Sequence, residues 1–339
     1  MTMPQHLGFR RHNMKLPRRT FLKLAGAVAT VTALPRIAMT QTYPTRPITL
    51  IVPLTAGSSS DVVGRVVADR MSKWLGQPII IENVSGADGT IGTGRAARAA
   101  PDGYTIAMGF TSSHTLNGAF YSLSYDVLND FAPISPLITG SLVLYARKTM
   151  PAKDLRELIA WLKSNPNKAS AGVFTGAFRL MNALLQRQTG TQFTLVPYRG
   201  SAPEVQDLIA GQIDLCFDTP VLLPLVRAGS IRAYAVTSDT RMALAPEIPT
   251  FAEMGLPALS FPIWQGLFAP KDTPNDIISK LNAATVEALA DPEVQSRFSD
   301  LGFQVFPRAL QTPQGLRAQQ KADIEKWWPI IKELMIDAE

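Results

Sequence analysis

The stretch from Ile48 to Phe110 constrains the fold of this chain more than any other part of its sequence. It contains three short apolar runs, rich in branched residues and bounded by glycine or proline: Ile48–Pro53, Pro78–Glu82 and Tyr104–Phe110. Runs of this kind are typical of buried parallel strands. Two segments with helical character separate them, so we predict strand, loop, helix, strand, loop, helix and strand, which is an α/β arrangement.

The two strand-to-helix loops of this unit are short and contain glycine. The first reads TAGSSSD over residues 55–61, and the second reads SGADGT over residues 85–90. Each ends where a helix is predicted to begin, so backbone N–H groups and the positive end of the helix dipole face out of the loop. Because such loops form the ligand crevice of an open α/β sheet, the pair predicts a site for a carboxylate or a phosphate. Tight turns alone would also explain the glycines and serines.

The rest of the chain predicts a second α/β unit and a return to the first. Strands are expected at 141–147, 169–174, 194–198, 213–217 and 231–237, with helices at 155–162, 180–188 and 202–210. A return strand at 261–270 precedes helices at 276–289, 292–301 and 313–334, and the last is expected to dock its apolar face on the first unit. Two crossings predict two lobes, 41–143 with 264–339 and 144–263, around the cleft of a hinge-closing binding protein.

Candidate ligand contacts come from strand ends and helix starts in both lobes. A third loop over residues 111–114, which reads TSSH, is expected to add hydroxyl donors at the same edge of the first sheet. The candidates in the first lobe are Ala56, Gly57, Ser58, Ser60, Asp61, Gly86, Ala87, Asp88, Gly89, Thr111 and Ser112. The candidates in the second lobe are Thr175, Gly176, Ala177, Phe217, Asp218 and Thr219. Arg179 is expected at the rim or in solvent more than on the ligand.

The first 40 residues predict an export leader. The run PRRTFLK over residues 17–23 is a twin-arginine pattern, and a small-residue apolar stretch follows it up to Leu34. That stretch is shorter than the roughly 20 residues that span a bilayer, and it fits the apolar region of a Tat signal peptide. Cleavage is expected between Ala38 and Thr42, and Met14 is an alternative start. No later segment is long and apolar enough to be an anchor, so we expect a periplasmic protein without one.

Charge and cysteine content exclude other classes. The chain has a formal net charge of +6, but seven of its 33 basic side chains and none of its 27 acidic ones lie in residues 1–40. Residues 41–339 therefore carry 26 basic and 27 acidic side chains, which removes the support for a nucleic-acid-binding surface. The single cysteine, Cys216, rules out an intramolecular disulfide and is expected to pack as a small buried residue in a strand.

The sequence offers little support for catalysis. Residues 41–339 contain one histidine, His114, so a metal site would depend on carboxylates and no metal or cofactor is expected. No G-x-S-x-G elbow presents a serine. The glycine-rich loops match neither the P-loop nor the dinucleotide-binding pattern. We therefore predict a protein that is not an enzyme and in which His114 is structural or borders the crevice.

Several motifs resemble the Bug family, the extracytoplasmic solute receptors of tripartite tricarboxylate transporters. They occur in family order from about Tyr43 to the C-terminus: GSSSDVVGR, ENVSGADGTIG, PDGYTIAMG, VPYRGSAPEVQDLIAGQIDLCFD, IRAYAVTS and PEIPTFAEMG. The resemblance implies the type II periplasmic binding fold, with the ligand held between two lobes. It also implies a monomeric receptor that delivers a small carboxylated solute to membrane components of the transporter. A ligand-sensing receptor and, as a third hypothesis, an exported α/β hydrolase remain alternatives.

The chain departs from the family pattern at two places. Ala177 and Phe178 stand where Ser and His are common, which puts the contacts of the second lobe in doubt. Asp88 stands in the second loop where the family usually has glycine. One interpretation is that Asp88 faces solvent and only tolerates a left-handed turn. The other is that its carboxylate lies at the crevice and disfavours a dianionic ligand.

Overall fold

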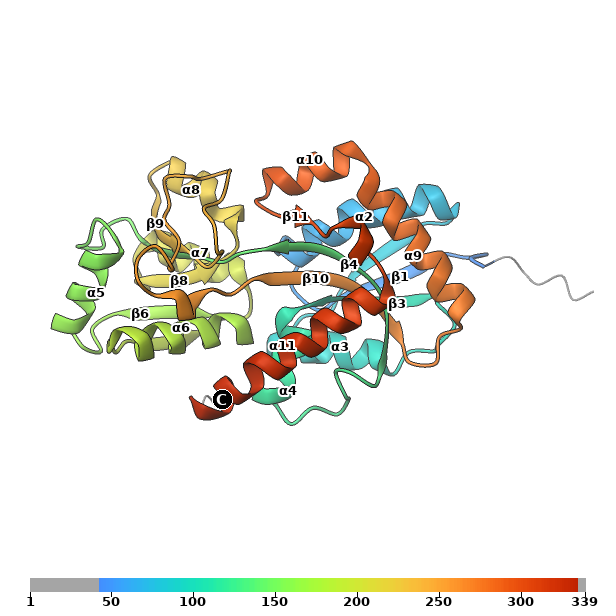
Figure 1. The fold of residues 1–339 in the computed structure, drawn as a ribbon, viewed down its shortest axis with the longest axis horizontal. Helices are drawn as coiled ribbons and strands as arrows, with labels where there is room; N and C mark the ends of the chain where they lie inside the picture. The colour runs from blue at the N-terminus through green and yellow to red at the C-terminus, as the bar shows by residue number, and fades with distance from the viewer. Residues whose placement is uncertain (1–42, 335–339) are drawn as a thin grey trace, which may run out of the picture. The chain divides into compact units, whose positions relative to one another are not determined.

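The computed structural model describes residues 43–334 of the 339-residue chain, so the predicted leader lies outside the described residues. The described strands form two sheets. One has the order β11-β4-β10-β3-β1-β2 and the other has the order β7-β6-β8-β5-β9. We call the part built on the first sheet lobe 1 and the part built on the second sheet lobe 2 (Figure 1). The α/β class predicted from the sequence is confirmed.

Lobe 1 contains the three parallel strands predicted from the opening stretch. Its strands are β1 (Ile48–Val52), β2 (Ile79–Asn83), β3 (Thr105–Phe110), β4 (Phe131–Gly140), β10 (Ile263–Pro270) and β11 (Gln304–Val305). β1 pairs in parallel with both β2 and β3. β10 runs antiparallel between β3 and β4, so the sheet is mixed. The carboxyl ends of β1, β2 and β3 therefore lie at one edge, as the loop argument requires.

Lobe 2 repeats this arrangement on a smaller scale. Its strands are β5 (Val143–Arg147), β6 (Ser170–Val173), β7 (Thr194–Pro197), β8 (Leu215–Asp218) and β9 (Ile231–Val236). β6 pairs in parallel with β7 and β8, and β5 runs antiparallel to β8 and β9. Cys216 is fully buried on β8, which confirms that it packs as a small core residue.

The chain crosses between the lobes twice. β4 leads into β5 through residues 141–142, and β9 leads back to β10 through residues 237–262. The two crossings are hydrogen-bonded to each other, because Leu142 N donates to Thr237 Oγ1 and Thr237 N donates to Leu142 O, both at 2.9 Å. Two adjacent crossings of this kind are the geometry of a hinge.

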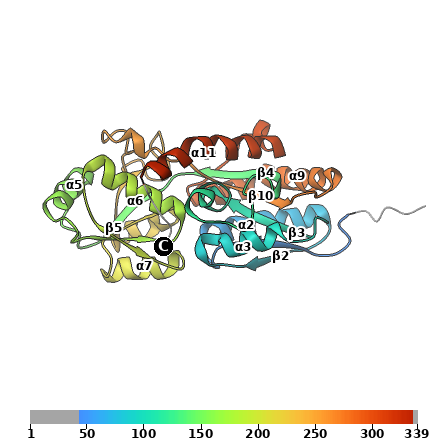
Figure 2. The same cartoon turned by 90° about the horizontal axis from the view of Figure 1, so that it is seen from below.

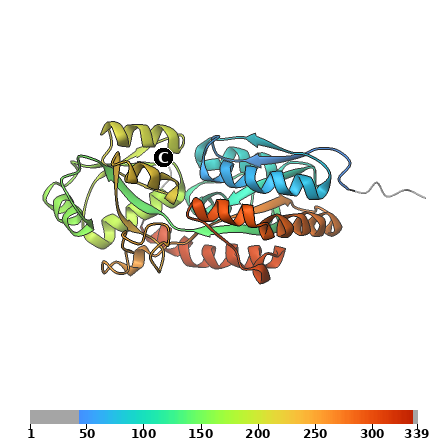
Figure 3. The same ribbon diagram turned by 90° about the horizontal axis from the view of Figure 1, so that it is seen from above.

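Helices cover the sheet of lobe 1. They are α2 (Ser59–Leu75), α3 (Thr90–Ala97), the short α4 (Asn117–Phe120), α9 (Asn275–Ala290), α10 (Pro292–Asp300) and α11 (Pro313–Glu333). α2 buries Val63, Val67 and Met71 at helical spacing and ends at Gly76, whose φ of 70° is left-handed. α2 packs beside α9, which Figure 3 shows from above. This packing fixes the direction in which the amino end of α2 points.

α11 docks on lobe 1, as predicted, and its carboxyl end reaches lobe 2 (Figure 2). Gln320 Nε2 donates to the backbone oxygens of His114 and Val127, and Trp328 Nε1 donates to that of Thr115. Glu333, at the end of α11, pairs with Arg187 of lobe 2. α11 therefore anchors one lobe and touches the other.

The helices of lobe 2 are α5 (Leu155–Ser164), α6 (Gly176–Thr189), α7 (Ser201–Ala210) and α8 (Leu223–Arg227). α6 begins directly after β6 and buries Leu180, Met181, Leu184 and Leu185 in the core. Its first residue is Gly176, four residues before the predicted start. The amino ends of α6 and α7 consequently point toward lobe 1.

Two sequence predictions were wrong in lobe 1. β4 is a ten-residue strand that we did not predict. Its partner on one side, β11, pairs only with Ile138 and Thr139, so Pro133 and Pro136 lie where β4 is an edge strand, which tolerates proline. Register shifts in its pairing with β10 accommodate those prolines. Residues 111–114 are not a loop, since a π-helical turn, Ser112–Leu116, follows β3 almost at once. The hydroxyl-bearing residues of this turn, Ser112, Ser113 and Thr115, are buried.

Candidate functional site

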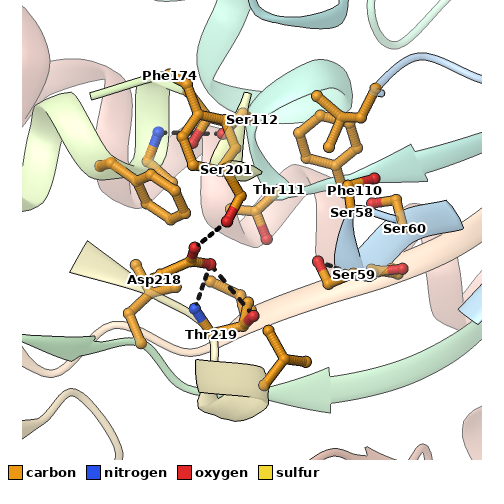
Figure 4. A pocket seen from close by; sticks show the side chains of 18 of the residues that line it. Ser58, Ser59, Ser60, Phe110, Thr111, Ser112, Phe174, Ser201, Asp218 and Thr219 are labelled. Atoms are coloured by element: carbon orange, nitrogen blue, oxygen red, sulfur yellow. Dashed lines mark hydrogen bonds between the residues drawn. The ribbon is translucent and has the colours of Figure 1, made fainter. Parts of the chain in front are cut away.

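A cavity of about 60 Å³ lies between the carboxyl ends of β1 and β3 and the amino ends of α6 and α7 (Figure 4). We call it the inner cavity. Hydroxyl groups dominate its polar lining, which consists of Ser58, Ser59, Ser60, Thr111, Ser112, Thr175, Ser201, Asp218, Thr219 and Gln265. One water needs roughly 10–15 Å³ of such volume, so the inner cavity holds about four waters or a small part of an organic solute.

The first loop forms the lobe 1 wall of the inner cavity. Ser58 is the N-cap of α2, and its Oγ accepts a hydrogen bond from Asp61 N at 3.3 Å. The Asp61 carboxylate in turn accepts from Gly57 N at 2.9 Å. Both bonds brace the loop from behind. The first N–H groups of α2 have no partners inside the helix and lie at the positive end of its dipole, beside the cavity.

Asp61 belongs to this brace and not to the cavity lining. Its carboxylate also accepts from Arg65 and from Asn83 Nδ2. Burial raises the pKa of Asp61, but these hydrogen bonds and the Arg65 charge outweigh burial and hold the pKa below its usual range. An ionised carboxylate that is saturated by its own lobe is a structural group, so Asp61 is removed from the ligand set.

The floor of the inner cavity comes from the return strand β10. Trp264 N donates to Thr111 Oγ1 at 2.9 Å, which holds the turn after β3 against β10. Gln265 Nε2 lies 3.4 Å from Ser59 Oγ. The Gln265 Oε1 atom is buried and has no hydrogen-bond partner among the described residues. The floor therefore offers an unused acceptor beside the first loop.

The lobe 2 wall is built around Asp218. Its carboxylate accepts from Ser201 Oγ at 2.5 Å and from Thr219 N at 2.6 Å (Figure 4). Burial raises the pKa of Asp218, and the hydrogen bonds from Ser201 and Thr219 oppose that rise. Behind it, Glu204 on α7 is fully buried, and neither of its carboxyl oxygens has a partner among residues 43–334. Burial, followed by the Asp218 charge, raises the pKa of Glu204 well above its usual range.

The amino end of α6 is capped from the opposite lobe. Its own N-cap residue, Thr175, makes no side-chain cap. Instead Ala177 N donates to Ser112 Oγ at 3.0 Å, and Gly176 N donates to Asp88 Oδ2 at 2.5 Å. Both acceptors belong to lobe 1. The two lobes are therefore in direct hydrogen-bonding contact at this point.

A larger outer cavity of about 420 Å³ lies on the far side of this contact. Leu54, Phe174 and Thr175 line both cavities and separate them. The remaining lining of the outer cavity includes the second loop, Ser85–Gly89, together with Tyr121, Arg179, Tyr198 and Arg199.

Asp88 has a left-handed backbone conformation, with φ 55°, as the first interpretation supposed, but its carboxylate is buried against lobe 2. The interpretation that Asp88 faces solvent is wrong.

The structure distributes the predicted site residues over three places. Gly57, Ser58, Ser60, Thr111, Ser112, Thr175 and Asp218 line the inner cavity. Gly86, Ala87, Asp88 and Gly89 line the outer cavity, and Gly176 lies at the contact between the lobes. Ala56, Asp61 and Phe217 line neither cavity, so their assignment is corrected. Ala56 is exposed, and Phe217 is fully buried because neighbouring strand residues face opposite sides, which leaves Asp218 alone toward the cavity.

Sequence reasoning missed three polar lining residues, Ser59, Ser201 and Gln265. Ser59 lies inside the predicted first loop and was passed over between two serines that were named. Ser201 begins α7 after a Gly, and the rule applied to the other strand-to-helix loops would have found it. Thr219 and Ala177 were among the sequence candidates, and both line the inner cavity. Gln265 lies in the middle of a buried strand, where only its tertiary neighbours show that it reaches the cavity.

His114 is structural. It is fully buried, its ring stacks on Phe268 at 4.1 Å between centroids, and its Nδ1 lies 2.9 Å from Ser113 Oγ. Burial, followed by the Arg317 charge, lowers its pKa to about 3. It lines neither cavity. A neutral, enclosed imidazole with such a low pKa is a poor general base, which removes the residue that a serine hydrolase would need.

The described residues show neither a metal site nor a membrane span. Within residues 43–334 there is no group of three or more His, Cys, Asp or Glu side chains that could hold a metal ion. Likewise, no helix in that range is both long enough and apolar enough to span a bilayer.

Comparisons with known proteins agree with this architecture. Residues 63–336 match the family model described as the tripartite tricarboxylate transporter family receptor. MatC from Rhodopseudomonas palustris with bound malate is 36% identical, with a TM-score of 0.82 over 85% of this chain and 100% of that one. Periplasmic binding protein BugD is 33% identical, and an R. palustris protein solved with adipate is 31% identical. Each of these two has a TM-score of 0.83 and covers 87% of this chain and 100% of its own.

Proposed function

The chain belongs to the tripartite tricarboxylate transporter receptor family and is a solute-binding receptor, and we propose that it binds a small carboxylated solute in the inner cavity. The membrane components of a tripartite transporter would then receive the solute. The structures with malate and adipate support the carboxylate class. Further support comes from the sequence, whose first loop has the form expected of an anion site.

One observation carries the proposal: the amino ends of α2 and α6 face the same small hydroxyl-lined cavity from opposite lobes. Helix amino ends attract anions through their N–H groups and their dipole. The first N–H groups of α6 are occupied by lobe 1 side chains, whereas α2 presents Ser59 and Ser60 to the cavity. The solute carboxylate would therefore bind at α2, with its remaining atoms toward lobe 2.

Periplasmic location and Tat export form part of the proposal. They rest on the leader sequence and on the family, whose relatives include a periplasmic binding protein. Replacing Arg18 and Arg19 by Lys is expected to stop export while the mature chain still folds. Cell fractionation with N-terminal sequencing of the exported form tests this. Normal arrival of the double variant in the periplasm would assign the leader to the Sec route.

Of the two alternatives, the hydrolase loses its support because His114 lies outside the cavities with a pKa of about 3. A sensing receptor would use the same fold and cavity. Solute uptake by cells that lack the transporter membrane components separates transport from sensing, because a transport receptor depends on those components. Unchanged uptake in such cells would favour sensing.

The binding experiment is calorimetric titration of the mature chain with small mono- and dicarboxylates and with their uncharged amides. We expect at least one acid to bind and its amide not to bind. Bound acid at 100 times Kd should stabilise the fold by about 2.7 kcal/mol and, because it bridges the lobes, should not increase the radius of gyration. Equal binding of an acid and its amide would contradict a carboxylate site.

A further inference from the structure

The contact between Asp88 and the amino end of α6 bears on which carboxylates this receptor accepts. Asp88 Oδ2 accepts from Gly176 N, and Ser112 Oγ accepts from Ala177 N. The first two N–H groups of α6 are thus both occupied by lobe 1. Helix amino ends are where a second anionic group of a solute would gain most from lobe 2. In this chain a protein carboxylate already holds that position.

The contact between Asp88 and Gly176 leaves no room for another anion between them. A Cβ added at Gly176 would lie 3.1 Å from Asp88 Oδ2 and 2.8 Å from Phe120 Cε2, so lobe 2 presents only backbone here. The other carboxyl oxygen, Oδ1, is buried and has no hydrogen-bond partner among the described residues. Adding a second negative charge next to an under-bonded buried carboxyl is unfavourable.

The backbone holds Asp88 in this position. Four successive residues, Gly86 to Gly89, have positive φ angles, and two of them, Ala87 and Asp88, are not glycine. Asn117 Nδ2 donates to Asp88 O at 2.9 Å and ties the turn to lobe 1. Left-handed non-glycine residues persist only where their surroundings hold them. The contact with Gly176 is one of the interactions that hold Asp88.

We propose that Asp88 determines specificity by standing in for the second carboxylate of a solute, so that the receptor selects monocarboxylates over dicarboxylates. This inference rests on the proposed function, because it assumes that a solute carboxylate binds at α2. The other end of the solute then meets Asp218, an acceptor, beside an amino end of α6 that Asp88 and Ser112 already occupy. A hydroxyl or amino group suits that end better than a second carboxylate.

Two substitutions separate the charge of Asp88 from its role as a cap. Asp88→Asn removes the charge and keeps an oxygen that can accept from Gly176 N. Asp88→Gly removes both and frees the N–H group. Asn and Gly both tolerate the left-handed conformation, so each variant is expected to fold. Asp69→Asn, an exposed change on α2 with the same effect on net charge, is the matched control.

The probes are two pairs of equal chain length, butyrate with succinate and hexanoate with adipate, titrated calorimetrically into all four proteins. We expect the wild type and Asp69→Asn to prefer the monocarboxylate. In Asp88→Asn and Asp88→Gly the affinity ratio should move toward the dicarboxylate by about 10- to 100-fold, with the larger change in Asp88→Gly.

The outcomes are distinguishable. Carboxylate binding with the same mono-to-dicarboxylate ratio in all four proteins overturns the role of Asp88 and leaves the proposed function intact. Failure of every protein to bind any carboxylate overturns both. A shift in Asp88→Gly without one in Asp88→Asn contradicts selection by charge, because only the charge is lost in the asparagine variant.

Discussion

The two lobes present different chemistry to the same cavity. Lobe 1 contributes serine and threonine hydroxyls and the amino end of α2, and the histidine buried behind this wall, His114, is a base with a lowered pKa. Lobe 2 contributes Asp218, backed by Glu204, and both of these buried acids have raised pKa values. Burial favours the neutral form in both lobes, and it therefore acts in opposite directions on the base and on the acids.

This difference indicates that the two lobes bind different parts of the solute. A wall of hydroxyl donors at a helix amino end suits an anion, whereas a wall that contains the Asp218 carboxyl group suits hydrogen-bond donors. An asymmetric cavity orients an asymmetric solute, with its carboxylate toward lobe 1. A symmetric dianion would have to place one end against acceptors.

The largest expected effect is an acid dependence of stability that originates in lobe 1. The unfolded chain protonates His114 below about pH 6.5, whereas the folded chain does so only near pH 3. Stability is therefore lost as pH falls through this window, by roughly 3 kcal/mol at pH 4. His114→Gln should remove that slope in urea titrations at pH 7 and pH 4. Because residues 41–339 contain no other histidine, NMR titration of its ring checks the pKa directly. A titration midpoint near 6.5 would contradict the claim that burial lowers the pKa of His114.

Next in size is the effect of removing the hydroxyls of the lobe 1 wall. Replacing Ser59 and Ser60 by Ala is expected to weaken carboxylate binding by about 10- to 100-fold, because hydrogen bonds to charged groups are worth roughly 1.5–3 kcal/mol. Ser201→Ala in lobe 2 should weaken it less, since that hydroxyl donates to Asp218. Ser279→Ala, exposed on α9, is the control. If calorimetry shows equal losses of affinity in the lobe 1 and lobe 2 variants, the proposal that lobe 1 binds the carboxylate is contradicted.

A smaller effect of opposite sign is expected from lobe 2. The folded chain keeps the Glu204 proton above the usual carboxyl pKa, so its contribution to stability is present in acid and is lost as pH rises. Glu204→Gln cannot ionise and should remove the loss of stability that this group causes between pH 5 and pH 6. Thermal unfolding at both pH values measures it, with exposed Glu247→Gln as the control. An unchanged pH dependence would mean that Glu204 is ionised in the fold.

The smallest effect is expected where the lobes touch through an exposed ion pair. Glu333→Gln removes the partner of Arg187, but both side chains are largely in water. Exposed pairs contribute little, so the melting temperature should change by no more than about 1 °C and solute affinity should not change. A clear change in affinity would show that the end of α11, and not only the cavity contacts, controls closure.

The sequence by itself determined the local elements of this fold. Branched apolar runs bounded by glycine and proline identified β1, β2 and β3, and helical spacing identified α2 and the helices after β10. These signals are local, because each depends on residues within one or two turns or one strand. Local signals also identified the first loop and the strand end at Asp218 as candidate ligand contacts. They did not show that Asp218 faces the cavity and that its neighbour Phe217 does not.

Which side chains meet depends on tertiary packing. β4 escaped prediction because two prolines weaken its local signal, and its antiparallel pairing with β10 supplies the hydrogen bonds and packing that its sequence does not indicate. Gln265 reaches the cavity from a strand that resembles any buried strand. Asp88 meets Gly176 across 88 positions of sequence, and that distance is closed only when both lobes are folded and the hinge brings them together. Contacts between distant segments depend on packing, which no local pattern encodes.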